Sequence, residues 1–318
     1  MRAKQVIDLD GDGDLELLAT VITGFEGYPR GLYCFDIETE SLIWTYHIGP
    51  IPGHVACPDL DGDGIPEILL TGDAANNEVT GPDGTSDTHS WVYALAPDGS
   101  PIWRRQVGPW YTYPQLEFQD REDGTAEILV LAHGEYKVRE ARGAEAYGEV
   151  WLLDSSGATL AQYDAEDTVY TWASLGSGED AFWLLLDRRG RLHQLNRNFQ
   201  LIRRAQVFEQ RFNALRSNLV GVTDMDGDGV EEMIVVVAQE QLLSEVNTGS
   251  SKAPSTSAHN HDVRVVALNR DLEIIADTLI EDKVESGYAP KGYVLERPGS
   301  LQSLVVLMNN VRRYRWEE

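Results

Sequence analysis

The chain has 318 residues, of which 42% are hydrophobic and 25% charged, a composition typical of a folded globular protein and not of a disordered one. Its 52 acidic and 26 basic residues give a formal net charge of −26, which disfavours nucleic acid and anionic lipid as partners and favours cations. No apolar run approaches the ~20 residues of a membrane-spanning helix and no signal peptide is recognisable, so we expect either a cytoplasmic protein or a piece of a longer exported one.

An acidic, glycine-rich stretch near the start of the chain sets its organisation. Residues 8–16 read DLDGDGDLE and continue into the apolar segment 17–22. Strand-like runs follow at 32–36 and 41–47, separated by turn residues, and nothing here shows the period of a helix. The stretch therefore begins a unit of short antiparallel strands.

The same order of parts returns immediately. A short run at 55–57 enters a second acidic stretch at 59–67, and further runs follow at 68–71, 91–95 and 102–105. Each unit is therefore predicted to contain four strands, with the acidic loop between the first strand and the second.

Four more copies follow with varying fidelity. The third has a shortened acidic loop at 120–127, the fourth, around 182–203, has lost its acids, and the fifth regains the full loop at 224–232. A low-complexity segment inside the fifth copy predicts a mobile loop at about 241–261 and not a linker between domains. The sixth copy is degenerate and ends at 311–316, one strand short of a full unit.

The spacing of the loops predicts the architecture. Loop starts at Asp8, Asp59 and Asp120 are 51 and 61 residues apart, and the 104 residues from there to Asp224 accommodate two units. Four strands per unit at this period are typical of propeller blades. We therefore predict an all-β protein with a single domain over residues 1–318: a β-propeller of about six four-stranded blades, or seven if flanking sequence is missing.

The chemistry of the acidic loops favours a hard cation. Carboxylates at alternate positions, with glycines between them, let several oxygens converge on one point, as calcium with its 6–8 oxygen ligands requires. Each intact loop offers three aspartates, a glutamate and, at the seventh position, a backbone carbonyl. The three predicted ligand sets are Asp8, Asp10, Asp12, Asp14 and Glu16; Asp59, Asp61, Asp63, Ile65 and Glu67; and Asp224, Asp226, Asp228, Val230 and Glu232.

The acidic loops do not match the EF-hand, another calcium-binding loop. An EF-hand places its bidentate acid at position 12 of the loop, but here that position holds Ala19, Leu70 or Val235, and a strand-like run replaces the helix. The EF-hand is therefore a poor match. The shortened third loop lacks one residue, so it is either a weakened fourth calcium site or a turn without metal; its candidate ligands are Asp120, Glu122, Asp123 and Glu127.

The three intact loops, at this spacing and before a strand, resemble the FG-GAP and VCBS repeats, a family of calcium-binding β-propellers related to the integrin α propeller. The resemblance covers essentially the whole chain and implies calcium loops between the first and second strands of blades. The FG and GAP signatures themselves are not clearly present, so integrin function is not implied. Hairpins such as 92–103 also resemble quinoprotein propeller repeats, which supports the architecture without implying the cofactor.

The edge opposite the acidic loops is the predicted place for a ligand. If those loops join first and second strands, the second-to-third loops and the connections between blades lie at the other edge, where aromatic residues gather. Aromatic side chains are typical of binding surfaces, although they also pack blade junctions. The candidate ligand residues are Trp110, Tyr111, Tyr113 and Trp172.

The resemblance implies a non-enzymatic recognition module that binds a protein or carbohydrate, as the adhesion or sensor input domain of a longer protein in the periplasm or at the cell surface. The alternative is a carbohydrate-active enzyme resembling a calcium-dependent rhamnogalacturonan lyase, for which no catalytic residue can be placed. The sequence also lacks a nucleophile-elbow motif and a P-loop. Its two cysteines, Cys34 and Cys57, are either buried thiols or one disulfide.

Overall fold

The computed structural model describes residues 1–24, 29–120, 125–134, 142–175, 182–207, 215–223, 232–241, 260–285, 291–295, 303–307 and 311–315. Within these ranges every regular element is a β-strand, which confirms the predicted all-β class, and no helix there is long and apolar enough to cross a membrane. The chain divides into two compact units, Met1–Thr168 and Val169–Glu318, and each is described by itself. That residues 1–318 form a single domain therefore remains a prediction.

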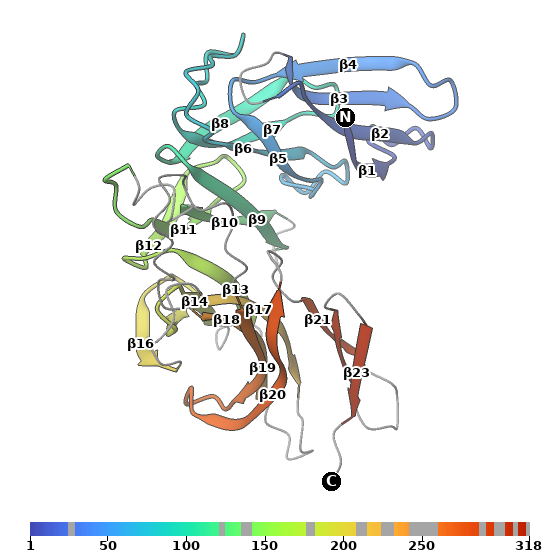
Figure 1. The fold of residues 1–318 in the computed structure, drawn as a ribbon. Coiled ribbons are helices and arrows are strands. Elements are labelled where there is room, and N and C mark those ends of the chain that lie inside the picture. Colours follow the sequence, from blue (N-terminus) through green and yellow to red (C-terminus); the bar gives the residue numbers. More distant parts are fainter. Residues whose placement is uncertain are drawn as a thin grey trace, which may run out of the picture. The chain divides into compact units, whose positions relative to one another are not determined.

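The first unit contains three four-stranded antiparallel sheets, each built from strands that are consecutive in the sequence (Figure 1). The first sheet is β1 (Arg2–Ile7), β2 (Glu16–Ile22), β3 (Arg30–Asp36) and β4 (Leu42–His47). The second is β5 (Ile51–Ala56), β6 (Ile68–Asp73), β7 (Ser90–Leu95) and β8 (Pro101–Gly108). The third is β9 (Thr112–Asp120), β10 (Ala126–Gly134), β11 (Gly148–Leu153) and β12 (Thr159–Asp164).

The second unit repeats this pattern with two four-stranded sheets and one in which three strands are described (Figure 1). Its first sheet is β13 (Val169–Leu175), β14 (Phe182–Asp187), β15 (Arg191–Asn196) and β16 (Leu201–Gln206). Next come β17 (Leu215–Thr223), β18 (Glu232–Gln241), β19 (Asn260–Leu268) and β20 (Ile274–Glu285). The last sheet is β21 (Lys291–Leu295), β22 (Ser303–Leu307) and β23 (Val311–Arg315). The predicted loop at 241–261 lies almost wholly outside the described residues.

Strand alternation explains how the sheets of the first unit pack. Successive residues of a strand point to opposite faces, and in β6 both faces are buried. Leu70 belongs to a core cluster with Leu18 and Leu32 of the first sheet, whereas its neighbour Leu69 belongs to a cluster with Val130 of the third. The second sheet is thus covered on both faces, which is why β6 opens with three consecutive apolar residues.

The outer strands tie neighbouring sheets together through tryptophan. In β4, Trp44 donates a hydrogen bond from Nε1 to the carbonyl of Pro97, 2.9 Å away in the next sheet. A Cβ at Gly99 would lie 2.6 Å from the Trp44 ring, and φ there is +79°, so only glycine fits this turn. Trp103 of β8 repeats the contact with the carbonyl of Ser155 at 2.8 Å.

Both cysteines are free thiols in the first unit. Cys34 is buried in the cluster between the first and second sheets, and Cys57, which is partly buried, packs against it. Burial raises the pKa of each thiol to about 12, so neither is a ready nucleophile at neutral pH.

Candidate metal loops and the opposite edge

The first acidic loop is held by one aspartate that binds the backbone on both of its oxygens. Asp8 accepts hydrogen bonds from the amides of Gly11, at 2.8 Å, and Gly13, at 3.1 Å. These two glycines have φ of +79° and +96°, a conformation that residues with a side chain rarely adopt. The alternating Asp–Gly pattern is therefore required by the backbone path of the loop.

The remaining acids of the first loop complete a tight turn. Asp10 accepts from the amide of Asp12 at 3.2 Å, and Asp12 accepts from the amide of Asp14 at 2.8 Å. Glu16 opens β2, is only 8% exposed, and accepts from the amide of Leu9 at 2.8 Å. Burial, and then the nearby aspartates, raise the pKa of Glu16, whereas the bond from Leu9 lowers it. The loop therefore concentrates negative charge that a cation would offset.

The second loop reproduces this arrangement bond for bond. Asp59 accepts from the amides of Gly62 and Gly64, at 2.7 and 2.8 Å. Asp61 accepts from Asp63, Asp63 from Ile65, and Glu67 from Leu60, at 3.2, 2.8 and 2.7 Å. Burial again raises the pKa of Glu67. Two segments 51 residues apart thus fold into the same loop.

The geometry of both loops fits a calcium ion. One carboxylate oxygen from each of Asp8, Asp10 and Glu16 lies within 4.8 Å of the others, and the same holds for Asp59, Asp61 and Glu67. Calcium binds oxygen at 2.3–2.6 Å, so oxygens sharing one ion lie within about 5 Å of each other. Asp12 and Asp63 lie outside these groups of three. Their carboxylates accept hydrogen bonds from the backbone amides two residues later.

The other predicted loops are described only in part. Glu127 in β10 and Glu232 in β18 are 7% and 4% exposed, so each lies buried at the start of a second strand, as Glu16 and Glu67 do. Asp120 ends β9, but its side chain, like Glu122 and Asp123, lies outside what the structure describes. The same applies to the predicted ligands Asp224, Asp226, Asp228 and Val230.

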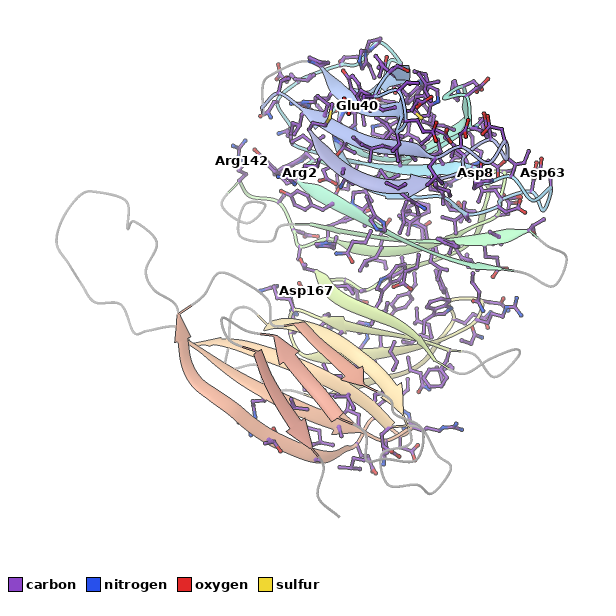
Figure 2. All side chains as sticks on the ribbon, turned by 90° about the vertical axis from the view of Figure 1, so that its right-hand side faces the viewer. Arg2, Asp8, Glu40, Asp63, Arg142 and Asp167 are labelled. Carbon is purple, nitrogen blue, oxygen red and sulfur yellow. The ribbon has the colours of Figure 1, made fainter. Side chains whose placement is uncertain are left out.

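The opposite edge of the first unit carries the aromatic residues. In Figure 2, Asp8 and Asp63 lie at one edge of its sheets and Arg142 lies at the other. Tyr111, between β8 and β9, has its ring 5.4 Å from that of Trp110 in an edge-to-face arrangement, and the guanidinium of Arg142 lies 5.1 Å from its ring centre. Its φ of +54° is rare for a residue with a side chain. Both rings are only partly buried.

The remaining two candidate ligand residues lie in different surroundings. Tyr113 of β9 is paired across the sheet with His133, and the two rings are 6.1 Å apart. Trp172 belongs to β13 of the second unit, is 8% exposed and lies 6.2 Å from Trp183, which packs in turn against Phe199. Packing accounts for Trp172, and we therefore leave it out of the candidate ligand edge.

A buried ion pair that the sequence did not reveal supports this edge. The loop at 74–89, between β6 and β7, folds around Asp87, whose Oδ1 accepts from the amides of Asn77 and Val79. Its Oδ2 pairs with Arg30 of β3 at 2.9 Å, and both side chains are 0% exposed. Ala74 at the start of this loop accepts from the amide of Tyr111 at 2.7 Å. The ion pair therefore fixes the loop that holds the aromatic connection.

The fold is shared with solved structures of low sequence identity. The WD40 domain of Toxoplasma gondii coronin is 10% identical, with 95% of this chain and 65% of that chain covered and a TM-score of 0.51. The C-terminal domain of Pseudomonas aeruginosa PilY1 is 10% identical, with 96% of this chain and 79% of that one covered and a TM-score of 0.50. The chain has a propeller-like fold.

No protein-family model matches the sequence, and no curated protein matches it. The resemblance to FG-GAP and VCBS repeats therefore remains a prediction that rests on the loop motif and its spacing. The blade number predicted from that spacing also remains a prediction.

Proposed function

We propose that this chain is a calcium-stabilised β-propeller that recognises a protein ligand at the edge opposite its calcium loops. One observation carries the calcium part: the loops at 8–16 and 59–67 share one hydrogen-bond pattern and bring the same three carboxylates within 4.8 Å of each other. Gathering three like charges in one turn costs electrostatic repulsion, which a bound cation would offset.

Asp8, Asp10 and Glu16 hold the first ion in this proposal, and Asp59, Asp61 and Glu67 the second. The carbonyls of Asp14 and Ile65 are the expected further ligands, and 224–232 forms the third site. A bound cation would offset the repulsion among the carboxylates and keep the first and second strands of each blade in register. Calcium thus has a structural role here, with no part in turnover.

The recognition part rests on the contrast between the edges of the first unit. The edge with Trp110 and Tyr111 offers partly exposed rings on a connection that is hydrogen-bonded to the loop at 74–89, which a buried ion pair fixes in place. Rigid aromatic side chains are the residues that most often dominate protein interfaces. An extracytoplasmic setting suits this proposal because weak, structural calcium sites fill at the calcium concentrations found outside cells.

Calcium titration by calorimetry tests the proposal. We expect at least two binding events per chain, and one fewer in Glu67→Gln, which removes a charged ligand but keeps the side-chain shape. Glu38→Gln, in the exposed turn between β3 and β4, is the matched control and should keep the full number. No calcium binding, or an unchanged number of sites in Glu67→Gln, would contradict the proposal.

A further inference from the structure

Three basic residues gather on the first strands of two adjacent sheets in this strongly acidic chain. Arg2 and Lys4 belong to β1, His54 belongs to β5, and all three are exposed. The two strands are in contact. Figure 2 places Arg2 on the same side as Arg142, away from Asp8 and Asp63. We call these three residues the basic cluster.

Irregular strand pairing positions the basic cluster. The register between β1 and β2 shifts between Ala3 and Gln5, and that between β5 and β6 shifts between Pro52 and Val55. Lys4 therefore lies unpaired in the irregularity of β1, and Gly53 and His54 lie unpaired in that of β5. Bulges redirect side chains and are frequent beside binding sites.

A direct bond joins the two bulges. Lys4 donates from Nζ to the carbonyl of Gly53 at 2.5 Å, and the amide of His54 donates to Oγ1 of Thr71 at 2.7 Å. A Cβ at position 53 would lie 2.5 Å from Oγ1 of Thr71 and 2.9 Å from Oδ1 of Asp73, so glycine leaves the space that Asp73 occupies. The bulges thus bring Lys4, His54 and Asp73 to one place.

The basic cluster carries more positive charge than Asp73 offsets, and a bound anion would supply the missing negative charge. Partial burial and then the charge of Arg2 lower the pKa of Lys4, whereas Asp73 raises it. Partial burial and then the charge of Lys4 lower the pKa of His54. Asp73 is the carboxyl group that opposes them, but burial raises its pKa to about 7, so its negative charge is incomplete at neutral pH. In its protonated form Asp73 is a hydrogen-bond donor.

The basic cluster is continuous with the aromatic edge. Asp73 is followed by Ala74, which accepts a hydrogen bond from the amide of Tyr111 and donates one to the carbonyl of Thr112 at 3.0 Å. A ligand that places an anion against Lys4 and His54 therefore extends toward Tyr111.

We propose that Arg2, Lys4 and His54 bind a single carboxylate of a peptide ligand, with Asp73 as its hydrogen-bonding neighbour. This inference rests on the proposed recognition function. The net charge of −26 repels polyanions at long range, which favours one carboxylate on an otherwise neutral or basic peptide over a polyuronate or a nucleic acid. Next to the partly exposed rings of Trp110 and Tyr111, such a site fits the end of a peptide chain.

NMR of the calcium-saturated full chain, with its histidine rings labelled, tests this assignment. We expect N-acetylglycine, which mimics a peptide C-terminus, to shift the His54 ring signal saturably, and N-acetylglycinamide, its neutral amide, to leave the signal unchanged. Lys4→Gln and, separately, Arg2→Gln should weaken the binding at least fivefold. Arg264→Gln, which removes a partly exposed charge in the second unit, should bind as the wild type does.

Several outcomes overturn the assignment. The first is that the His54 signal shows no saturable shift. The second is that Lys4→Gln and Arg2→Gln bind N-acetylglycine as tightly as the wild type does, with a wild-type fold by circular dichroism. The third is that glucuronate or phosphate binds at least ten times more tightly than N-acetylglycine. Calcium titration of the same samples separates this inference from the proposed function. Normal calcium binding with no carboxylate site removes only the inference, and absent calcium binding removes the calcium-stabilised scaffold itself.

Discussion

The two edges of the first unit differ in how far they repeat. At the acidic edge, the loops at 8–16 and 59–67 share the same bonds, glycine conformations and buried glutamate. At the opposite edge, the loop at 74–89 and the connection at 109–111 have no counterpart of the same sequence in the first sheet. Repetition marks a loop that the first two sheets share, whereas divergence marks the places where one surface can differ from another.

The contrast extends to how each edge balances charge. The acidic loops leave carboxylates crowded, with backbone amides as their bonding partners, and we propose that an external cation offsets this charge. The opposite edge instead balances Asp87 with Arg30 inside the protein. One edge should therefore respond to calcium, and the other to substitution of its own side chains.

The largest effect should come from breaking the internal pair. Arg30→Ala leaves Asp87 buried without its cation, and removing one partner of a buried pair costs about 3–5 kcal/mol. Urea denaturation with saturating calcium measures this loss of unfolding free energy. Arg264→Ala, which breaks an exposed pair with Asp277, is the control and should cost about 1 kcal/mol or less. Equal losses in the two variants would mean that the Arg30 pair does not hold the loop.

Two tryptophans sharpen the assignment of the ligand edge. Trp172→Ala removes a buried ring that packs against Trp183 and should cost about 3 kcal/mol, at the lower end for core aromatics. Trp110→Ala, at a partly exposed ring, should cost about 1 kcal/mol or less. Denaturation curves of both variants measure the loss of unfolding free energy. A larger loss in Trp110→Ala than in Trp172→Ala would mean that Trp110 belongs to the core.

Removal of one calcium ligand should have an intermediate effect that depends on the metal. A ligand present at 100 times its Kd stabilises the native state by about 2.7 kcal/mol per site. Glu67→Gln should lose most of one such contribution in calcium and almost none in chelator. Denaturation under both conditions measures the difference. A loss of the same size without calcium would show that Glu67 acts only through its bond to Leu60.

The smallest effect concerns pH at the opposite edge. Burial raises the pKa of Asp73 from 3.8 to about 7, so its contribution to stability is complete below about pH 4 and is lost as pH rises through about 7. Asp73→Asn lacks this titration, and relative to wild type it should gain about 1 kcal/mol between pH 4 and pH 8, discounted for the partial exposure of Asp73. If the unfolding free energies of the wild type and Asp73→Asn change with pH in the same way, the pKa of Asp73 is not raised.

Much of the fold was predictable because strands and loops are local features. The run predicted at 41–47 is observed as Leu42–His47, and that at 91–95 as Ser90–Leu95. The acidic loops were also predictable, since each is a contiguous stretch whose glycines and aspartates sit at fixed spacing. Boundaries were less exact for β5, which was predicted from residue 55 and begins at Ile51, because Pro52 and Gly53 are poor strand formers.

The opposite edge was less predictable because its determinants are distant in sequence. Arg30 and Asp87 are 57 residues apart and neither lies in a motif, so no local sequence pattern predicts that they form an ion pair. The bulges that redirect Lys4 and His54 depend on pairing with β2 and β6, which no single segment encodes. Trp172 illustrates the converse: it lies in the middle of β13, and an aromatic residue looks the same in sequence whether it packs the core or faces a ligand.

Thermal unfolding in chelator and in millimolar calcium tests the central claim most directly. If the acidic loops bind calcium in the native state alone, the melting temperature of the wild type rises with calcium concentration, and the rise is smaller in Glu67→Gln and unchanged in Glu38→Gln. An identical melting temperature for the wild type in chelator and in millimolar calcium would contradict the claim that these loops are calcium sites.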